Sequence, residues 1–535
     1  MLLLEHSGEV VTREQLREQL WANTTFVDFN HGLNSAVRKL RAALGDTATK
    51  ARYIETLSKV GYRLTVPVHE IERRPIDSVV VLPFLNLSDD PGVEYFAEGI
   101  TDELTTRLAK IGALRVISRT SAMCYGRTRK SLSDIGRELR VEAVVEGTVR
   151  RAGSKVRIYA QLIDATADTH IWAETYEGEV DDVLFLQSSL AGAIATAIKG
   201  RLTEQERASL AKARPVVKPA YDAYLRGRHA WGKGTAENLK RAALHFEEAI
   251  EQDPTYPLAY VGLADSYLVR AFYSVLAPRE AYPKAKAAAM RALEIDDSSG
   301  EALASLANVQ LNFEWDWAAA KATYARAVSL APNYATAYQW QSELPTILGR
   351  FDEGIRCLLR AQELDPLSTR ISSMIGWTHY FARQYDRAKD QLRMVVDQAP
   401  DSAMAHLWLG QVLQQMGECE PAIAELEHAV AMFGSKVCLG TLANACCAAG
   451  CTERAKTLVS EMRQLEEAHR HFPAYALAEA FAGLNDHDSA FLYLRKAYAQ
   501  REPALLFIGV EPRMDCLRAD SRFRDLVVDV GLPMA

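Results

Sequence analysis

A period of 34 residues runs through the second half of this 535-residue chain. Pro332, Pro366 and Pro400 are each 34 positions apart, and Gly434 follows at the same interval. A fixed period in this range indicates stacked supersecondary units that cannot bury their apolar faces alone. Small residues, which antiparallel helices need where they cross closely, recur in pairs at matching places: Ala242 and Ala249, Ala285 and Ala292, Ala320 and Ala327, Gly354 and Ala361, Ala422 and Ala429. The period therefore predicts an all-α solenoid.

The units resemble the tetratricopeptide repeat, whose characteristic end is seen at Asp253-Pro254 and Asp365-Pro366. We place the repeat region at 215–500, followed by a capping segment at 501–535. The units are predicted to start near residues 223, 257, 301, 335, 369, 403, 436 and 471, with the last two degenerate. The resemblance implies a superhelix whose concave groove binds a protein or peptide partner.

Two tryptophans, Trp231 and Trp377, occupy the ninth position of their units. Aromatic residues dominate protein interfaces, so both are candidate contacts for a partner in the groove. The alternative is that they pack against neighbouring repeats, as large aromatic side chains usually do. No unit carries the Asn that the carboxylate-clamp version of the repeat requires at the ninth position, so such a clamp is not expected.

A second informative segment lies near the amino terminus, where a helix with a basic face precedes a short hairpin. Apolar residues recur there at spacings of three and four, which predicts that they share one buried face of the helix: Leu33, Val37, Leu40 and Leu44. Asn34, Arg38 and Arg41 then fall on the opposite face, and Asn and Arg match the edges of adenine and guanine in the major groove. Upstream, Thr12 to Gln15 reads as a capping box, and Gly45 is predicted to end the helix.

Positive charge is concentrated in this segment. Between Arg38 and Arg63, seven basic residues stand against two acidic ones, a local charge of +5 in a chain whose net charge is −7. Such a concentration is the electrostatic footprint of phosphate binding. The alternative is an ordinary amphipathic helix whose basic residues are solvated.

The phrases EVVTREQLREQLW, LNSAVRKLRAALGD and IETLSKVGYRL resemble the OmpR/PhoB-type winged-helix DNA-binding domain of bacterial transcription regulators. The resemblance implies that the second phrase is the recognition helix and GYRL the wing, with Trp21 and Tyr62 in the core. It further implies the site residues: Asn34, Arg38, Lys39 and Arg41 on the recognition helix, and Lys59 and Arg63 on the wing against the DNA backbone. The loop with Thr25, Asp28 and Asn30 would contact RNA polymerase, as in some relatives.

This winged-helix domain, placed at residues 1–66, is predicted to be truncated at its amino terminus. Relatives begin with a small antiparallel sheet, whereas here only a short leucine run precedes Gly8. Either the true start lies upstream, or the domain is trimmed and less stable. A polar segment bounded by Pro67 and Pro75 follows and is interpreted as a linker, 67–78.

Residues 79–204 alternate strand and helix patterns and predict an α/β domain with a mixed sheet. The phrases VVLPFLNLSDDPGVEYFAEGITDELTTRLAKI and VVEGTVRRAGSKVRIYAQLIDA resemble the TolB amino-terminal-like domain, found in bacterial regulators and next to some cyclases. The resemblance implies an interaction or sensory module. Its acidic residues Asp102 and Glu103 are interpreted as helix caps rather than metal ligands.

Catalytic motifs are missing from the sequence: it has no nucleophile elbow, Walker A loop, H-E-x-x-H or Rossmann glycine fingerprint. Histidines such as His406 show no ligand spacing, and the cysteines near Cys447 and Cys451 are interpreted as buried thiols, with a metal or redox role as the alternative. We therefore expect no catalytic residue, no cofactor, no metal site and no enzymatic activity. Without an apolar stretch of membrane-spanning length or a signal peptide, a cytoplasmic protein with no membrane partner is expected.

Together these features predict a multidomain protein: a truncated winged helix (α+β), an α/β mixed-sheet middle domain and an all-α tetratricopeptide superhelix. The predicted function is a transcriptional regulator that binds promoter DNA through the winged helix and receives input through the other two parts. Its partners would be double-stranded DNA, RNA polymerase and a protein or peptide in the groove. The alternative is a protein-interaction scaffold with a non-functional winged-helix remnant.

Overall fold

The computed structural model divides into two compact units, Met1–Pro75 and Ile76–Ala535. It describes residues 2–20, 29–47, 51–66, 76–88, 94–112, 114–126, 130–179, 183–200, 202–211, 217–232, 236–433, 437–468 and 472–533. Most of the expected linker therefore lies outside the described residues. None of the helices described in these ranges is long and apolar enough to cross a membrane.

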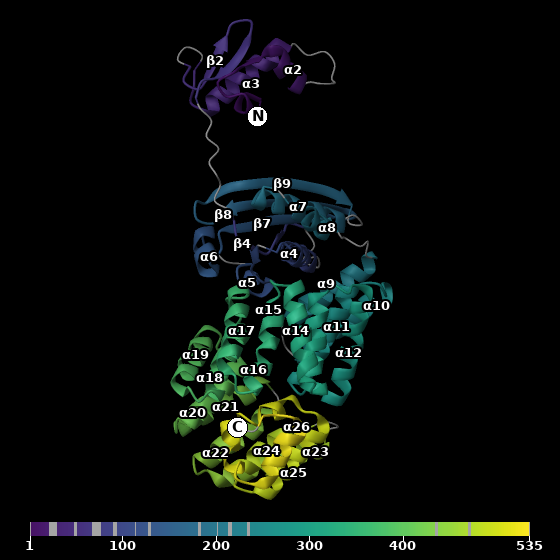
Figure 1. The fold of residues 1–535 in the computed structure, drawn as a ribbon, viewed down its shortest axis with the longest axis vertical. Coiled ribbons are helices and arrows are strands. Elements are labelled where there is room, and N and C mark those ends of the chain that lie inside the picture. The colour runs from purple at the N-terminus through teal and green to yellow at the C-terminus, as the bar shows by residue number, and fades with distance from the viewer. Residues whose placement is uncertain are drawn as a thin grey trace. The chain divides into compact units, whose positions relative to one another are not determined.

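The first unit is a small α+β fold with an antiparallel sheet in the order β1-β3-β2 (Figure 1). Its described elements are α1 (Leu2–Glu5), β1 (Val10–Thr12), α2 (Arg13–Leu20), α3 (Phe29–Ala43), β2 (Ile54–Leu57) and β3 (Gly61–Leu64). The capping box is confirmed, because Thr12 N–H donates to Gln15 Oε1 at 2.8 Å and Gln15 N–H to Thr12 Oγ1 at 3.2 Å. Gly45 ends the α3 segment with φ +64°, as predicted.

The β2–β3 hairpin is the wing, and its pairing with β1 requires Gly61. A Cβ atom at Gly61 would lie 2.1 Å from the carbonyl oxygen of Val11, so no larger residue fits without moving the strands. Tyr62 is 2% exposed and belongs to the core of this unit, as expected. The sheet, α2 and α3 therefore share one small core, which fixes α3 against the wing.

The second unit begins with a mixed sheet in the order β6-β4-β7-β8-β9, with β5 pairing to β7. Its strands are β4 (Ser78–Val81), β5 (Leu85–Asn86), β6 (Arg115–Val116), β7 (Ala143–Ala152), β8 (Lys155–Asp164) and β9 (Thr169–Glu179). Its helices are α4 (Glu94–Leu108), α5 (Arg119–Met123), α6 (Leu132–Leu139), α7 (Val183–Lys199) and α8 (Glu204–Ala211). The predicted mixed sheet is confirmed, since β4 runs parallel to β6 and β7 whereas β7, β8 and β9 are antiparallel.

Both faces of β4 are covered. Val79 and Val81 belong to the core that contains α4 and α7, whereas Val80 belongs to the core that contains α5 and α6. Successive side chains of a strand point to opposite faces, so a continuous apolar strand needs cover on both.

The repeats form antiparallel helix pairs that run from teal to yellow in Figure 1. The described pairs are α9 (Lys218–Gly232) with α10 (Ala236–Gln252), α11 (Pro257–Phe272) with α12 (Pro278–Ile295), α13 (Gly300–Val309) with α14 (Trp317–Leu330), α15 and α16 (Ala335–Gln341 and Glu343–Ile347) with α17 (Phe351–Leu364), α18 (Thr369–Phe381) with α19 (Tyr385–Gln398), α20 (Ala403–Gln415) with α21 (Cys419–Phe433), α22 (Val437–Ala448) with α23 (Thr452–Ala468), and α24 (Ala474–Gly483) with α25 (His487–Gln500). Two 3₁₀ turns (Pro503–Phe507 and Pro512–Leu517) and α26 (Ser521–Val530) follow.

The mixed sheet and the repeats share polar and apolar contacts. Tyr221 of α9 and Phe246 of α10 belong to the same core cluster as α4 and α7. Asn333, in a turn between repeats, donates to the carbonyl oxygens of Ala109 and Leu114 at 3.0 and 2.9 Å. These contacts explain why residues 76–535 form one compact unit.

Candidate nucleic-acid interface

Helix α3 buries Leu33 and Val37, which are 4% and 6% exposed, as the sequence predicted. The prediction that Leu40 and Leu44 are also buried was wrong, because each is 43% exposed. Arg41 is buried instead. Positions 33, 37 and 41 are separated by four residues each, so they lie in one row along the helix. The basic residue therefore points inward, contrary to its predicted place beside Asn34 and Arg38.

Arg41 ties α3 to the first wing strand. Its Nη2 donates to the carbonyl oxygen of Ile54 at 2.7 Å and to Thr56 Oγ1 at 2.8 Å. Both acceptors lie on β2, so the guanidinium fixes the distance between α3 and the wing. Arg41 is consequently a positioning residue, and reading a base would require breaking these hydrogen bonds.

Asn34 is exposed but its amide oxygen is already engaged. Asn34 Oδ1 accepts hydrogen bonds from the hydroxyl of Tyr62 at 2.9 Å and from Nη2 of Arg13 at 3.1 Å. Arg13 also donates to the Tyr62 hydroxyl at 3.0 Å. The three side chains link α2, α3 and β3, and these contacts use the amide oxygen of Asn34 but not its NH₂ group.

Arg38 and Lys39 are exposed on α3. Within the described part of the chain, neither side chain has a hydrogen bond or ion pair to another residue. Arg38 lies one turn after Asn34, so the two share the outer face of the helix. This face carries unneutralised positive charge and is the site's main feature.

The two wing residues differ in their surroundings. Lys59 is exposed at the tip of the hairpin, in the left-handed conformation with φ +62°. Arg63 is opposite Glu55 in the β2–β3 ladder, and its Nε and Nη2 donate to Glu55 Oε2 at 3.0 and 2.6 Å. Lys59 thus offers a free charge, whereas the charge of Arg63 is largely neutralised.

Asp46 fixes the start of the wing. Its carboxylate accepts hydrogen bonds from the backbone N–H groups of Arg52, Ile54, Tyr53 and Thr47, at 2.8 to 3.1 Å. These donors, with Arg52 first, lower the pKa of Asp46 from its ordinary 3.8 to about 2. The sequence predicted only the helix end at Gly45, and this role of Asp46 was not predicted.

The expected polymerase-contact loop falls mostly outside the described residues. Trp21, Thr25 and Asp28 belong to the undescribed stretch 21–28, whereas Asn30 lies in the first turn of α3.

Trp377 packs in an aromatic stack inside the repeats. Its ring lies 4.8 Å from that of Trp408 at an interplanar angle of 9°, and 4.6 Å from that of Phe507. It also lines a cavity on the inner side of the superhelix. Trp231, in contrast, is partly buried against the core beside the mixed sheet, with Arg228 over its ring at 5.5 Å.

The acidic residues of α4 form ion pairs, and the interpretation of Asp102 and Glu103 as helix caps was wrong. Glu103 pairs with Arg107 one turn later at 2.7 Å, and Asp102 pairs with Arg228 of α9 at 3.1 Å. Both acids lie in the middle of α4, where no free backbone N–H remains to be capped.

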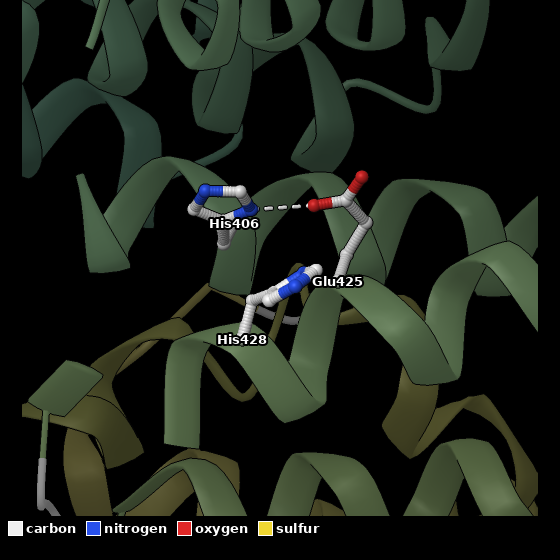
Figure 2. Close-up of side chains that lie close together, drawn as sticks. All are labelled: His406, Glu425 and His428. Atoms are coloured by element: carbon white, nitrogen blue, oxygen red, sulfur yellow. Dashed lines mark hydrogen bonds and ion pairs between the residues drawn. The ribbon is translucent and has the colours of Figure 1, made fainter. Parts of the chain in front are cut away.

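Three potential metal ligands meet in the repeats, a grouping not predicted from the sequence. Figure 2 shows His406 of α20 and Glu425 of α21 pointing toward each other, with His428 one turn along α21. His406 Nδ1 lies 2.5 Å from Glu425 Oε2, and Nε2 lies 3.0 Å from the carbonyl oxygen of Pro400. Both ring nitrogens of His406 already have oxygen partners, so the contact between His406 and Glu425 joins α20 to α21. The Glu425-x-x-His428 spacing was the available signal in the sequence.

Parts of the chain are similar to known proteins. Residues 1–64 match the family described as transcriptional regulatory protein, C terminal, and residues 374–402 match a tetratricopeptide repeat. Over 401 residues the chain is 22% identical to transcriptional regulator HilA of Salmonella typhimurium, covering 74% of this chain and 70% of HilA. Over 65 residues it is 37% identical to transcriptional activator CadC of Escherichia coli, covering 12% of each chain.

A further relative carries an enzyme's name. The chain is 36% identical over 201 residues to a protein named adenylate cyclase 3 from Rhizobium meliloti, covering 37% of this chain and 33% of that relative. The chain therefore spans about a third of this relative's length. Taken together, the similarities support a DNA-binding transcription regulator whose repeats serve protein interaction. The chain is similar to HilA and CadC, and it carries a match to the OmpR/PhoB-type domain at its amino terminus and tetratricopeptide repeats behind it.

Proposed function

We propose that the chain regulates transcription by placing the outer face of α3 in the major groove of promoter DNA. Arg38 and Lys39 supply the free cationic donors, and Asn34 supplies its NH₂ group. Arg is the side chain best suited to guanine, whose O6 and N7 atoms it can contact together. The observation that carries the proposal is this exposed basic face on a helix that Arg41 fixes to the wing.

The wing would hold the flanking phosphates. Lys59 stands free at the hairpin tip and is the stronger candidate, whereas Arg63 would first have to share its charge with Glu55. Phosphate contacts fix the register of a protein on DNA without reading sequence. The segment with Thr25, Asp28 and Asn30, which reaches into the first turn of α3, is proposed to contact RNA polymerase.

The repeats are proposed to receive the regulatory input by binding a protein or peptide partner. Trp377 is the better of the two tryptophan candidates, because it lines the inner cavity, whereas Trp231 packs near the mixed sheet. In this proposal the protein acts in the cytoplasm and has no catalytic role of its own.

A mobility-shift titration on a regulated promoter tests the DNA contact. We expect Arg38→Ala to weaken specific binding by about 1 to 3 kcal/mol, the range for a good base contact. The matched control is Arg356→Ala, which removes an exposed arginine from α17 in the second unit. Equal affinity of Arg38→Ala and the control would refute the assignment and favour a scaffold with an inactive winged helix.

A further inference from the structure

The inner side of the repeat superhelix contains a cavity of about 130 Å³. Its walls come from the first helices of several pairs, including α18, α20, α22 and α24, and from the 3₁₀ turns that follow α25. An apolar cavity of about 150 Å³ admits one benzene molecule, so this cavity can hold one molecule with a single six-membered ring. Trp377, Trp408 and Phe507 form an aromatic wall along it.

Polar atoms without partners belong to residues that line this cavity. Gln411 and Tyr475 are 5% and 6% exposed, and neither Gln411 Oε1 nor the Tyr475 hydroxyl has a hydrogen-bond partner within the described structure. Trp377 Nε1 is likewise buried and unpartnered. Most buried polar side-chain atoms in proteins are hydrogen-bonded, so these three atoms would gain hydrogen bonds from a molecule bound in the cavity. Gln411 Oε1 and the Tyr475 hydroxyl can accept a hydrogen bond, whereas Trp377 Nε1 can only donate one.

The charges around the cavity are not balanced. Glu511 and Glu479 both pair with Arg513, whose Nη2 lies 2.8 and 2.9 Å from their oxygens. Among the described residues, Glu502 pairs with no cation at hydrogen-bond distance and instead accepts from the backbone N–H groups of Ala474 and Tyr475. One arginine thus faces three acidic side chains, and burial raises the pKa of two of them, Glu479 and Glu502, to about 7. A bound cation would favour their charged forms and would also gain from the aromatic wall. An anion would disfavour those charged forms, and the one arginine is already paired.

We propose that this cavity binds one small organic cation, a protonated amine on a flat, ring-sized body. The ammonium group would donate to Gln411 Oε1, to the Tyr475 hydroxyl and toward Glu479, while the ring packs against Trp377. A ligand that also carries an acceptor would satisfy Trp377 Nε1. This site belongs to the second unit, and the proposal does not depend on the proposed DNA contact.

Three probes of nearly the same shape test the proposal with the full chain: benzylamine, benzyl alcohol and benzoate. Calorimetric titration at neutral pH should show benzylamine binding at least about tenfold more tightly than benzyl alcohol, with benzoate the weakest. Quenching of tryptophan fluorescence by benzylamine should accompany binding, because Trp377 and Trp408 line the cavity. Equal affinities for the amine and the alcohol, or no binding of benzylamine at millimolar concentration, would overturn the proposal.

Two glutamine variants test whether Gln411 contacts the bound amine. Gln411→Leu removes one acceptor at nearly constant volume and should weaken benzylamine about fivefold or more. Gln398→Leu, at an exposed position of α19, is the matched control and should leave the affinity unchanged. An equal loss in both variants would refute the assigned contact. The probe series on the unaltered protein does not depend on the folding of either variant.

Discussion

Arg228 of α9 and Asp102 of α4 form an ion pair between the first repeat helix and the helix that covers the mixed sheet. Arg228 Nε lies 3.1 Å from Asp102 Oδ2, and the two side chains are 26% and 10% exposed. A buried charge whose partner is removed loses more than the hydrogen bond itself, because it remains desolvated.

We therefore expect Arg228→Met to lower the free energy of unfolding of the second unit by about 2 kcal/mol. The loss stays moderate because Arg119 Nε remains 4.0 Å from Asp102. Urea denaturation followed by circular dichroism measures the effect. Combining Arg228→Met with Asp102→Asn should recover part of the loss, and a double variant that is simply additive would argue against coupling between the two residues.

The burial of Arg41 gives it a different phenotype from Arg38. Arg41→Met should loosen the contact between α3 and β2 and destabilise the first unit by about 2 kcal/mol, since it removes two hydrogen bonds. Amide hydrogen exchange at Ile54 to Leu57 should accelerate. Arg38→Ala should leave that exchange unchanged. If Arg41→Met lost DNA specificity while the exchange rates stayed the same, the positioning role would be wrong.

Lys59 combines a phosphate-contact candidate with a strained backbone. Both Lys59→Ala and Lys59→Gly should weaken binding to all DNA sequences alike and reduce the salt slope by about 1. Only glycine relieves the φ of +62°, so Lys59→Gly should be more stable than Lys59→Ala by about 1 kcal/mol. Salt-dependent titration and thermal melting separate the two effects. Equal melting temperatures of the two variants would contradict the strain.

The depressed pKa of Asp46 predicts a defined acid response. Its folded value of about 2 lies below the ordinary 3.8, because backbone N–H groups led by that of Arg52 stabilise the carboxylate. The resulting stability is present above pH 3.8 and is lost as the pH falls through about 2. Asp46→Asn should remove this stabilisation at neutral pH. The variant should then lose less further stability than the unaltered protein as the pH falls from 3.8 to about 2. Near-neutral and acid hydrogen exchange at Arg52 and Ile54 provides the measurement.

Glu502 should respond in the opposite sense. Burial raises its pKa from the ordinary 4.5 to about 7, despite the hydrogen bonds from Tyr475 and Ala474. The folded state therefore retains the proton, and stability declines as the pH rises from 4.5 toward 7. Glu502→Gln should therefore reduce the loss in free energy of unfolding between pH 4.5 and 7 by up to about 3 kcal/mol. Because the pKa of Glu479 is also about 7, the variant should keep a residual slope in urea titrations across this range. An unchanged slope would contradict the assignment.

The sequence alone determined the features that depend on neighbours along the chain. The repeat helices begin close to the expected positions, for example at Thr369 and Ala403, because period and small-residue spacing are local properties of each helix pair. The capping box of Thr12 and Gln15 and the helix end at Gly45 were predictable for the same reason, since each involves residues only a few positions apart. The mixed sheet followed from alternation and apolar runs.

Only the tertiary structure decided which charges are free and which are fixed. Arg41 and Arg38 look alike in the sequence, but only Arg41 meets the acceptors of β2, which lies 13 and 15 residues away. Arg228 and Asp102 are 126 residues apart, and the cavity near Trp377 is built from helices and turns of several repeats. Periodicity reports that a residue lies on one face of its own helix. Which residues cover that face depends on packing between segments that are distant in the sequence. Because burying an unpaired polar group costs free energy, a buried charge is stable only where such packing provides it with a partner.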